Sequence, residues 1–113
     1  MIKVKFIKNE NNFVGVDCSG HAGYADMGAD IVCAAVSSLV QNVEIALSEV
    51  LNINLNVNRN DKNAKLFIKL PKNVSSENLN KSQILFLSLK ISLERIENQY
   101  KKYLKVEVEN EIL

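Results

Sequence analysis

The chain has few histidines and cysteines, the residues that most often bind zinc. Its 113 residues include one histidine, two cysteines, one proline and no tryptophan. The lone histidine and the two separated cysteines do not show the ligand spacing of a zinc site. The glycine pattern that cradles phosphate is also missing. We therefore expect neither a metal ion nor a cofactor.

Long apolar runs and an excess of one charge are missing too. Fourteen basic and thirteen acidic residues leave a net charge of +1, so composition gives no sign of the long-range attraction that drives nucleic-acid binding. The longest unbroken apolar run, 31–36, is far shorter than the ~20 residues of a membrane helix. Residues 1–12 alternate apolar and charged side chains, unlike a signal peptide. We expect a cytoplasmic protein with reduced thiols and no contact with membrane or nucleic acid.

The hydrophobic pattern predicts one domain over 1–113 with an α+β fold. Alternating apolar residues predict strands near 2–6, 13–18, 55–57, 66–70 and 106–108, with Val14, Val16 and Cys18 on one face of the second. Apolar residues at three- and four-residue steps predict two long helices, at 30–51 and from Ser75 or Ser76 to about Tyr103. The resulting order, ββαββαβ, suits a sheet packed against two helices.

The sequence also predicts where the first helix begins and which faces of both helices are apolar. Asp30 is a good N-cap residue for the first, whose apolar stripe is expected to include Val36 and Val50. The second has more apolar residues than one buried face requires, because an extra row runs along Ile84, Leu87 and Ile91. This row indicates either a deeply buried helix or a contact between subunits.

The residues with chemical potential cluster around the start of the first helix. With Asp30 as N-cap, Cys33 lies among backbone N–H groups without an intrahelical acceptor, where the helix dipole favours a thiolate. His21 lies in the preceding glycine-rich loop, 19–29, and an adjacent imidazole completes a cysteine nucleophile. Free N–H groups near Cys33 and from a Gly28–Ala29 turn are candidate oxyanion donors.

Each of these residues also has a simpler interpretation. A loop histidine is more often a surface residue, and a cysteine in an apolar stretch is usually a small core residue. Ser37 follows Cys33 by one helical turn and either assists the site or borders the packed stripe. Asp30 either orients the imidazole or only caps the helix, and Asp26 is another candidate partner. Cys18 is expected to be a buried strand residue.

One run of residues resembles a known family. Gly20-His21-Ala22, then Ala25 and Gly28, then Asp30-Ile31-Val32-Cys33-Ala34 with Ser37 resemble the bacterial ribosomal-processing cysteine protease family, Prp. This motif covers about a fifth of the chain. The resemblance implies that His21 and Cys33 form a catalytic dyad, and that Asp30 and Ser37 belong to the recurrent active-site pattern. In the surrounding loop, Gly20, Ala22, Gly23, Tyr24 and Gly28 are candidates for contacting and closing over the substrate.

The resemblance also implies a substrate and an oligomeric state. The family consists of homodimeric endopeptidases that remove the amino-terminal extension of large-subunit ribosomal protein twenty-seven, and their cleavage motif is rich in Phe, Leu and Gln. Two other functions remain open at this point. One is a non-catalytic, ribosome-associated binding module with a local basic face, built for example from Lys3, Lys5 and Lys8. The other is a thiol redox sensor that pairs Cys18 with Cys33.

Overall fold

The structure, a computed structural model, describes the backbone of residues 1–20 and 27–111 and the side chains of 1–20 and 30–111. Its elements follow the expected α+β order, ββαββαβ, with one π-helical segment, η1, after the first helix. They are β1 (Ile2–Asn9), β2 (Asn12–Ser19), α1 (Met27–Ile45), η1 (Ala46–Val50), β3 (Asn56–Asn60), β4 (Lys65–Lys69), α2 (Ser76–Gln99) and β5 (Leu104–Asn110).

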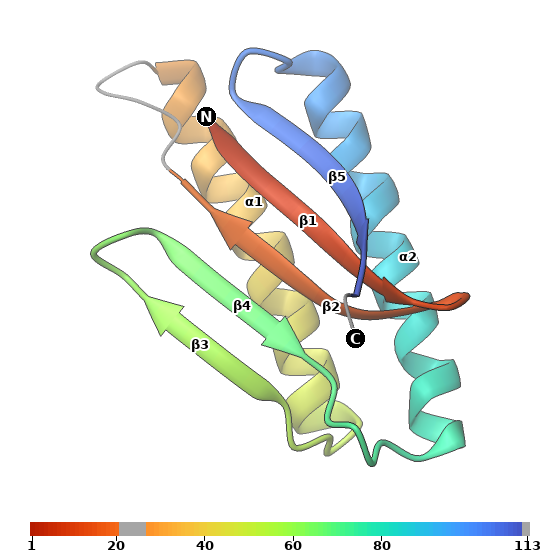
Figure 1. Cartoon of the computed structure of the whole chain (residues 1–113). Helices are drawn as coiled ribbons and strands as arrows, with labels where there is room; N and C mark the ends of the chain where they lie inside the picture. Colours follow the sequence, from red (N-terminus) through yellow and green to blue (C-terminus); the bar gives the residue numbers. More distant parts are fainter. Residues whose placement is uncertain (21–26, 112–113) are drawn as a thin grey trace.

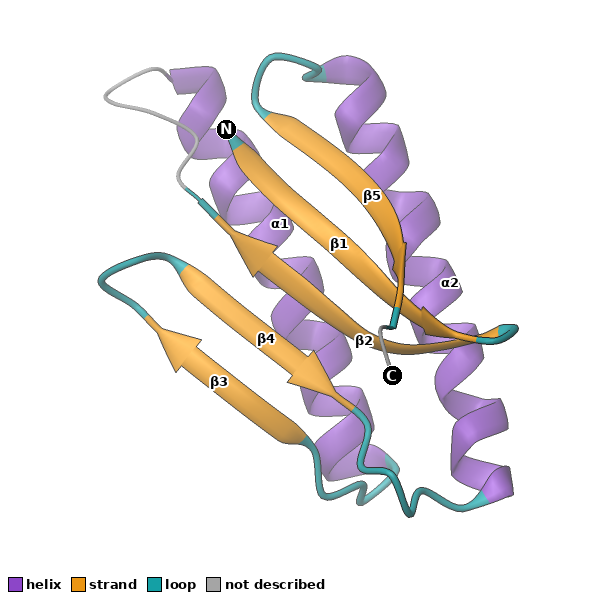
Figure 2. Cartoon of the chain, in the orientation of Figure 1, coloured by secondary structure: helices purple, strands orange, loops and turns teal. Residues whose placement is uncertain are grey.

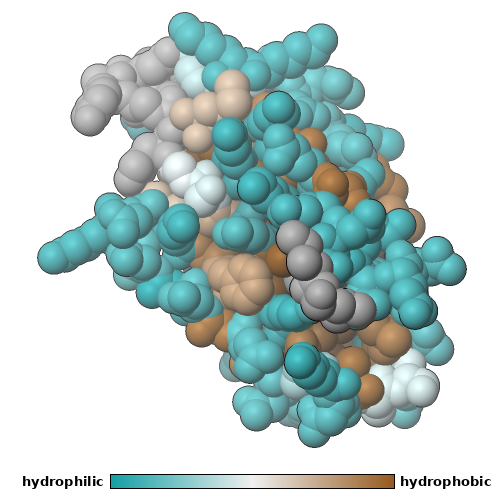
Figure 3. Space-filling view, viewed as in Figure 1, coloured by the Kyte–Doolittle hydropathy of each residue, from teal (hydrophilic) through white to brown (hydrophobic). Residues whose placement is uncertain are grey.

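The five strands form one sheet in the order β3-β4-β2-β1-β5. Only the β1–β5 pair is parallel, and the other three pairs are antiparallel. Both helices cover the same face of the sheet, which leaves the other face open (Figures 1 and 2). The open face carries mainly hydrophilic side chains with smaller hydrophobic areas between them (Figure 3). The protein therefore has two layers, with its core between sheet and helices.

Strand alternation builds the sheet side of this core. Ile2, Val4 and Phe6 of β1 are all buried, as their alternation with lysines predicts. Val16 of β2 and Ile68 of β4 pair with each other on the same face. The other buried apolar residues are Val32, Val36, Val40, Val43, Leu47, Ile53, Leu70, Phe86, Leu89, Leu93 and Leu104.

A β-bulge changes the face assignment at the start of β2. Ile7 pairs with Gly15 but Lys8 pairs with Phe13, so Val14 is the extra residue. Phe13 therefore packs against the core, its ring 5.8 Å from that of Phe6 in an edge-to-face arrangement. The prediction that Val14 continues the buried row was wrong, because simple alternation does not include an inserted residue.

The first helix begins earlier than the sequence suggests. α1 starts at Met27, so Asp30 lies within its first turn and is not the N-cap, and Gly28 lies in the helix and not in the loop. Asp30 is of a residue type that favours the N-cap position. An acidic side chain in the first turn also complements the helix dipole, and methionine and alanine are good helix formers. Residue type alone therefore did not distinguish a cap from a first-turn position.

The end of this helix widens into the π-helical turn η1. The Leu51 N–H donates to the Ala46 carbonyl at 3.0 Å, five residues earlier. Leu47 is buried here, whereas Val50 is 72% exposed. Val50 was expected on the buried stripe. The wider turn shifts the helical phase, which a regular three- and four-residue pattern does not anticipate.

By length and composition alone, Asp30–Val50 is apolar enough to cross a membrane. The sequence analysis did not predict this, because polar residues interrupt the segment and its longest unbroken apolar run is 31–36. In this fold one stripe of the same helix, including Val32, Val36 and Val40, is buried in the core between the helices and the sheet. The segment is 28% buried, as expected of a helix that packs one stripe on a core.

The second helix begins where expected and ends slightly sooner. Ser75 is its N-cap, and the Ser75 hydroxyl accepts a hydrogen bond from the Asn78 N–H at 3.1 Å. The helix ends at Gln99, so Tyr103 packs on the core from the following turn and not from the helix. The apolar row Ile84, Leu87 and Ile91 is exposed, at 73%, 48% and 43%.

Candidate active site

A cleft of about 140 Å³ lies beside α1, near the end of β2 and the turn between β3 and β4. Its wall includes Cys33 and Ser37 from α1, together with Cys18 and Gly20 from the end of β2. The remaining lining residues are Ile2, Val36, Val40, Gln41, Arg59, Asp61, Ala64, Lys65 and Leu66. The cleft thus joins several of the residues selected from the sequence with a hairpin that lies far from them in the chain.

Cys33 is a half-buried, free thiol in the second turn of α1. Because the helix starts at Met27, the Cys33 N–H lies beyond the first four residues, and regular helical bonding supplies its acceptor. The expectation that Cys33 sits at N3 among free N–H groups was therefore wrong, as was that of a Gly28–Ala29 turn. The helix dipole acts mainly within the first turn, so a nucleophilic role for Cys33 would depend more on a neighbouring base.

Ser37 and Asp30, the two polar residues selected beside Cys33, have different positions. Ser37 lies one turn after Cys33 and lines the same cleft. Asp30 is exposed and, within the described part of the chain, is not among the residues that line the cleft. The geometry therefore brings Ser37 to the thiol and leaves Asp30 at the start of the helix.

Gly20, directly after β2, has a backbone conformation that other residues rarely adopt. Its φ angle is +98°, and a Cβ atom at this position would lie 2.4 Å from the Met1 carbonyl oxygen. Its N–H donates to the Ala64 carbonyl at 3.2 Å, which ties β2 to the turn before β4. The glycine of the sequence motif is thus required by both backbone angle and close approach.

Cys18, the second thiol of the cleft, has a different environment. It lies on the core face of β2 between Val4 and Leu66, as the sequence predicted. Burial, with smaller contributions from Asp17 and Cys33, raises the pKa of the Cys18 thiol to about 11. Cys18 is therefore protonated at neutral pH and unsuited to act as a nucleophile.

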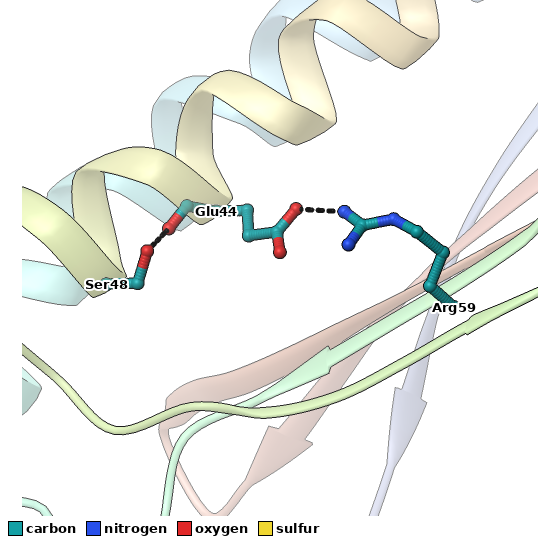
Figure 4. A network of polar contacts seen from close by, with 3 residues as sticks. All are labelled: Glu44, Ser48 and Arg59. Atoms are coloured by element: carbon teal, nitrogen blue, oxygen red, sulfur yellow. Dashed lines mark hydrogen bonds and ion pairs between the residues drawn. The ribbon is translucent and has the colours of Figure 1, made fainter.

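The β3–β4 hairpin contributes residues that sequence analysis missed. Arg59, Asp61 and Lys65 line the cleft with Gln41 of α1. Arg59 forms an ion pair of 2.6 Å with Glu44 of α1 (Figure 4). These residues reach the cleft only because the hairpin packs beside α1. A local sequence motif therefore does not predict them.

Several of the selected residues lie outside the described part of the chain: His21, Ala22, Gly23, Tyr24 and Asp26. The dyad itself thus remains a prediction from the sequence. Among residues 1–20 and 27–111, no group of three His, Cys, Asp or Glu side chains is arranged to hold a metal ion.

The family model described as cysteine protease Prp matches residues 1–105. The ribosomal processing cysteine protease Prp of Bacillus subtilis is 26% identical over 98 residues, which are 87% of this chain and 88% of that protein.

Solved structures resemble the fold closely. A Streptococcus mutans crystal structure superposes with a TM-score of 0.84 at 23% identity, covering 98% of this chain and 96% of the other. The S. aureus ribosomal processing protease Prp in complex with a substrate peptide superposes with a TM-score of 0.82 at 24% identity, covering 96% and 100%. The same S. aureus protease has also been solved with a covalently linked product peptide, with a TM-score of 0.80 at 24% identity and the same coverage. At these identities the likeness establishes the fold.

Proposed function

The chain belongs to the cysteine protease Prp family, and from this premise we propose that it is an endopeptidase with Cys33 as nucleophile and His21 as proton-transfer partner. One observation carries the proposal. The Cys33 thiol borders the same cleft as Gly20, and His21 is the next residue in the sequence. A half-buried thiol at a cleft lined by the residue before the histidine supports the proposal that the two form a Cys–His pair.

The proposed reaction has two steps. The Cys33 thiolate attacks the scissile carbonyl carbon, the C–N bond breaks, and the His21 imidazolium gives its proton to the leaving amine. An acyl-enzyme remains on the sulfur. His21 then removes a proton from water, which attacks the thioester and releases the new carboxyl end and Cys33. No metal or cofactor takes part in these steps.

We propose the amino-terminal extension of large-subunit ribosomal protein twenty-seven as the substrate, cleaved in the cytoplasm during ribosome maturation. The B. subtilis relative is a ribosomal processing protease, and the S. aureus relative has been solved with a substrate peptide. The apolar part of the cleft, with Val36, Val40 and Leu66, fits apolar peptide side chains. As in the family the sequence resembles, we propose a homodimer, for which the Ile84, Leu87 and Ile91 row is available.

Two substitutions test the mechanism. Incubation of the wild-type protein with the extended ribosomal protein should shorten it by the extension, read by intact mass. Cys33→Ser and His21→Ala should each lower kcat by at least about a thousandfold, because each removes one half of the pair. Unchanged thermal unfolding would show that both variants fold. Normal turnover by either variant would reject the dyad, and tight binding of the extension without cleavage by wild type would favour the binding module.

A further inference from the structure

The cleft extends well beyond Cys33. Cys33, Ser37 and Gln41 follow one another at four-residue steps on one face of α1, and all three line it. At 1.5 Å per residue, Gln41 lies about 12 Å along the helix from Cys33. An extended peptide covers roughly 3.3 Å per residue, so this distance corresponds to three or four substrate residues.

Arg59 lies on the wall opposite this helix face. It belongs to β3, an edge strand whose five residues are all exposed. One of its Nη atoms contacts the Glu44 carboxylate at 2.6 Å, and the Arg59 and Glu44 side chains are 44% and 17% exposed. Figure 4 shows the guanidinium reaching from the strand toward the helix. Glu44 lies three residues after Gln41 on α1, so the guanidinium that it holds lies toward the Gln41 end of the cleft and away from Cys33.

This ion pair is better suited to binding a ligand than to stabilising the fold. An ion pair between partly exposed side chains contributes little to stability, because water screens the attraction. A guanidinium carries five N–H donors in a planar fork, and one carboxylate leaves donors for a second acceptor. Because Arg59 lines the cleft, these donors are available to a peptide bound there.

The surrounding charges favour a neutral acceptor. Glu44 balances Arg59, and Asp61 and Lys65 on the same hairpin add one charge of each sign to the cleft. A substrate carboxylate would meet Glu44 and Asp61 as well as the two cations. A carbonyl oxygen accepts the same hydrogen bonds without this repulsion.

We propose that Arg59 is a specificity-determining residue, positioned by Glu44, that donates hydrogen bonds to a carbonyl oxygen of the bound peptide three or four residues from the scissile bond. The acceptor is either a main-chain carbonyl or a side-chain carboxamide. The proposal rests on the proposed function, since it requires Cys33 at the scissile bond.

The test compares Arg59→Met with a matched substitution, Arg95→Met. Methionine keeps much of the side-chain stem and removes the donors, and Arg95 is exposed on α2, away from the cleft. The probe is a peptide with six residues on each side of the cleavage site of the extended ribosomal protein. Loss of a hydrogen bond from a charged donor should raise KM about tenfold and leave kcat unchanged. Arg95→Met should change neither constant. Glu44→Gln should raise KM by a smaller factor, because it loosens Arg59 without removing its donors.

Truncated and modified peptides locate the acceptor. Peptides shortened to two residues on one side of the scissile bond should be cleaved equally by wild type and Arg59→Met. Peptides shortened on the other side of the scissile bond should still show a higher KM for Arg59→Met than for wild type. A thioamide at the third or fourth residue weakens the main-chain carbonyl as an acceptor. Replacing a carboxamide side chain at the same position by leucine removes the side-chain acceptor. Whichever change abolishes the difference between wild type and Arg59→Met identifies the acceptor.

Binding to a Cys33→Ala background separates this proposal from the proposed function. Peptide affinity, measured by fluorescence anisotropy, should fall about tenfold when Arg59→Met is added. The inference is overturned if Arg59→Met behaves like Arg95→Met, lowers kcat instead of raising KM, or affects short and long peptides equally. If wild type cleaves no peptide and Cys33→Ala binds none, the proposed function fails instead.

Discussion

Two thiols share the cleft, and their surroundings give them different reactivity. Both are half-buried and pack against the core, Cys33 from α1 and Cys18 from β2, the central strand of the sheet. The pKa of Cys18 rises to about 11 mainly because burial penalises the thiolate. The thiolate, and not the thiol, reacts with electrophiles, so this difference is measurable.

Alkylation should therefore distinguish the two cysteines. With iodoacetamide at pH 7.5, the folded protein should be modified at Cys33 well before Cys18. A raised pKa keeps Cys18 protonated, so its modification rate should increase about tenfold per pH unit until the pH nears 11. Peptide mapping by mass spectrometry gives the rate at each site. In denaturant both sites should react at similar rates, and rapid labelling of Cys18 in the folded state at pH 7.5 would contradict the prediction.

At the scale of the elements, the Gln83 side chain of α2 forms with β2 the pair of hydrogen bonds that a neighbouring strand would form. The Gln83 amide donates to the Phe13 carbonyl at 2.8 Å, and its oxygen accepts from the Phe13 N–H at 2.7 Å. These bonds satisfy both backbone groups of Phe13, next to the bulge. The same amide also donates to the Leu79 carbonyl at 3.2 Å. Gln83 thereby fixes the second helix on the sheet where the strand ladder is irregular.

Removing this amide should destabilise the protein. Gln83→Met keeps most of the volume but leaves the Phe13 backbone groups without these partners, at a cost of about 1–3 kcal/mol in unfolding free energy. Urea unfolding followed by circular dichroism measures the loss. Lys81→Met, at an exposed position two residues earlier in the helix, should change stability by less than about 0.5 kcal/mol. Equal stability of the two variants would show that the Phe13 groups find other partners.

The same elements explain what sequence reasoning could and could not provide. Alternation in β1 and the Ser75 cap were sufficient to place a strand and a helix start, because local residue types determine both. The bulge and the π-helical turn were missed, since each inserts a residue into a periodic pattern, and the Met27 start was missed because an acidic residue suits both a cap and a first turn. The motif pointed to Cys33 and Ser37 at the cleft. Arg59 was missed because its position depends on the sheet topology.

For the whole molecule, one apolar surface is left uncovered by the two-layer arrangement. Ile84, Leu87 and Ile91 lie at three- and four-residue steps on α2, and all three are exposed. Burying such a row is favourable by about 25 cal/mol per Å² of apolar surface. The proposed dimer would remove this surface from water.

A charge within the row should therefore yield monomers. Leu87→Glu places a carboxylate in the proposed interface, where burial without a partner is costly. We expect wild type to elute as a dimer and Leu87→Glu as a monomer in size-exclusion chromatography with light scattering. Val50→Glu is the matched control, because Val50 is also exposed and apolar but lies in η1, outside the row. If Leu87→Glu stays dimeric, or if Val50→Glu becomes monomeric, the interface is not the Ile84, Leu87 and Ile91 row.

The first two residues of the chain lie at the wall of the cleft, where Ile2 lines it and the Met1 carbonyl packs against Gly20, another lining residue. The Met1 carbonyl lies so close to Gly20 that a Cβ atom there would be 2.4 Å away, and the Ile2 N–H donates to the Tyr103 carbonyl at 2.8 Å while Ile2 itself lines the cleft. An affinity tag fused before Met1 would emerge beside the proposed site of reaction. By contrast, β5 ends next to Lys8, at the opposite end of β1 from Ile2. Purification handles and immobilisation linkers therefore belong at the carboxyl end if kinetics are to report the unperturbed enzyme.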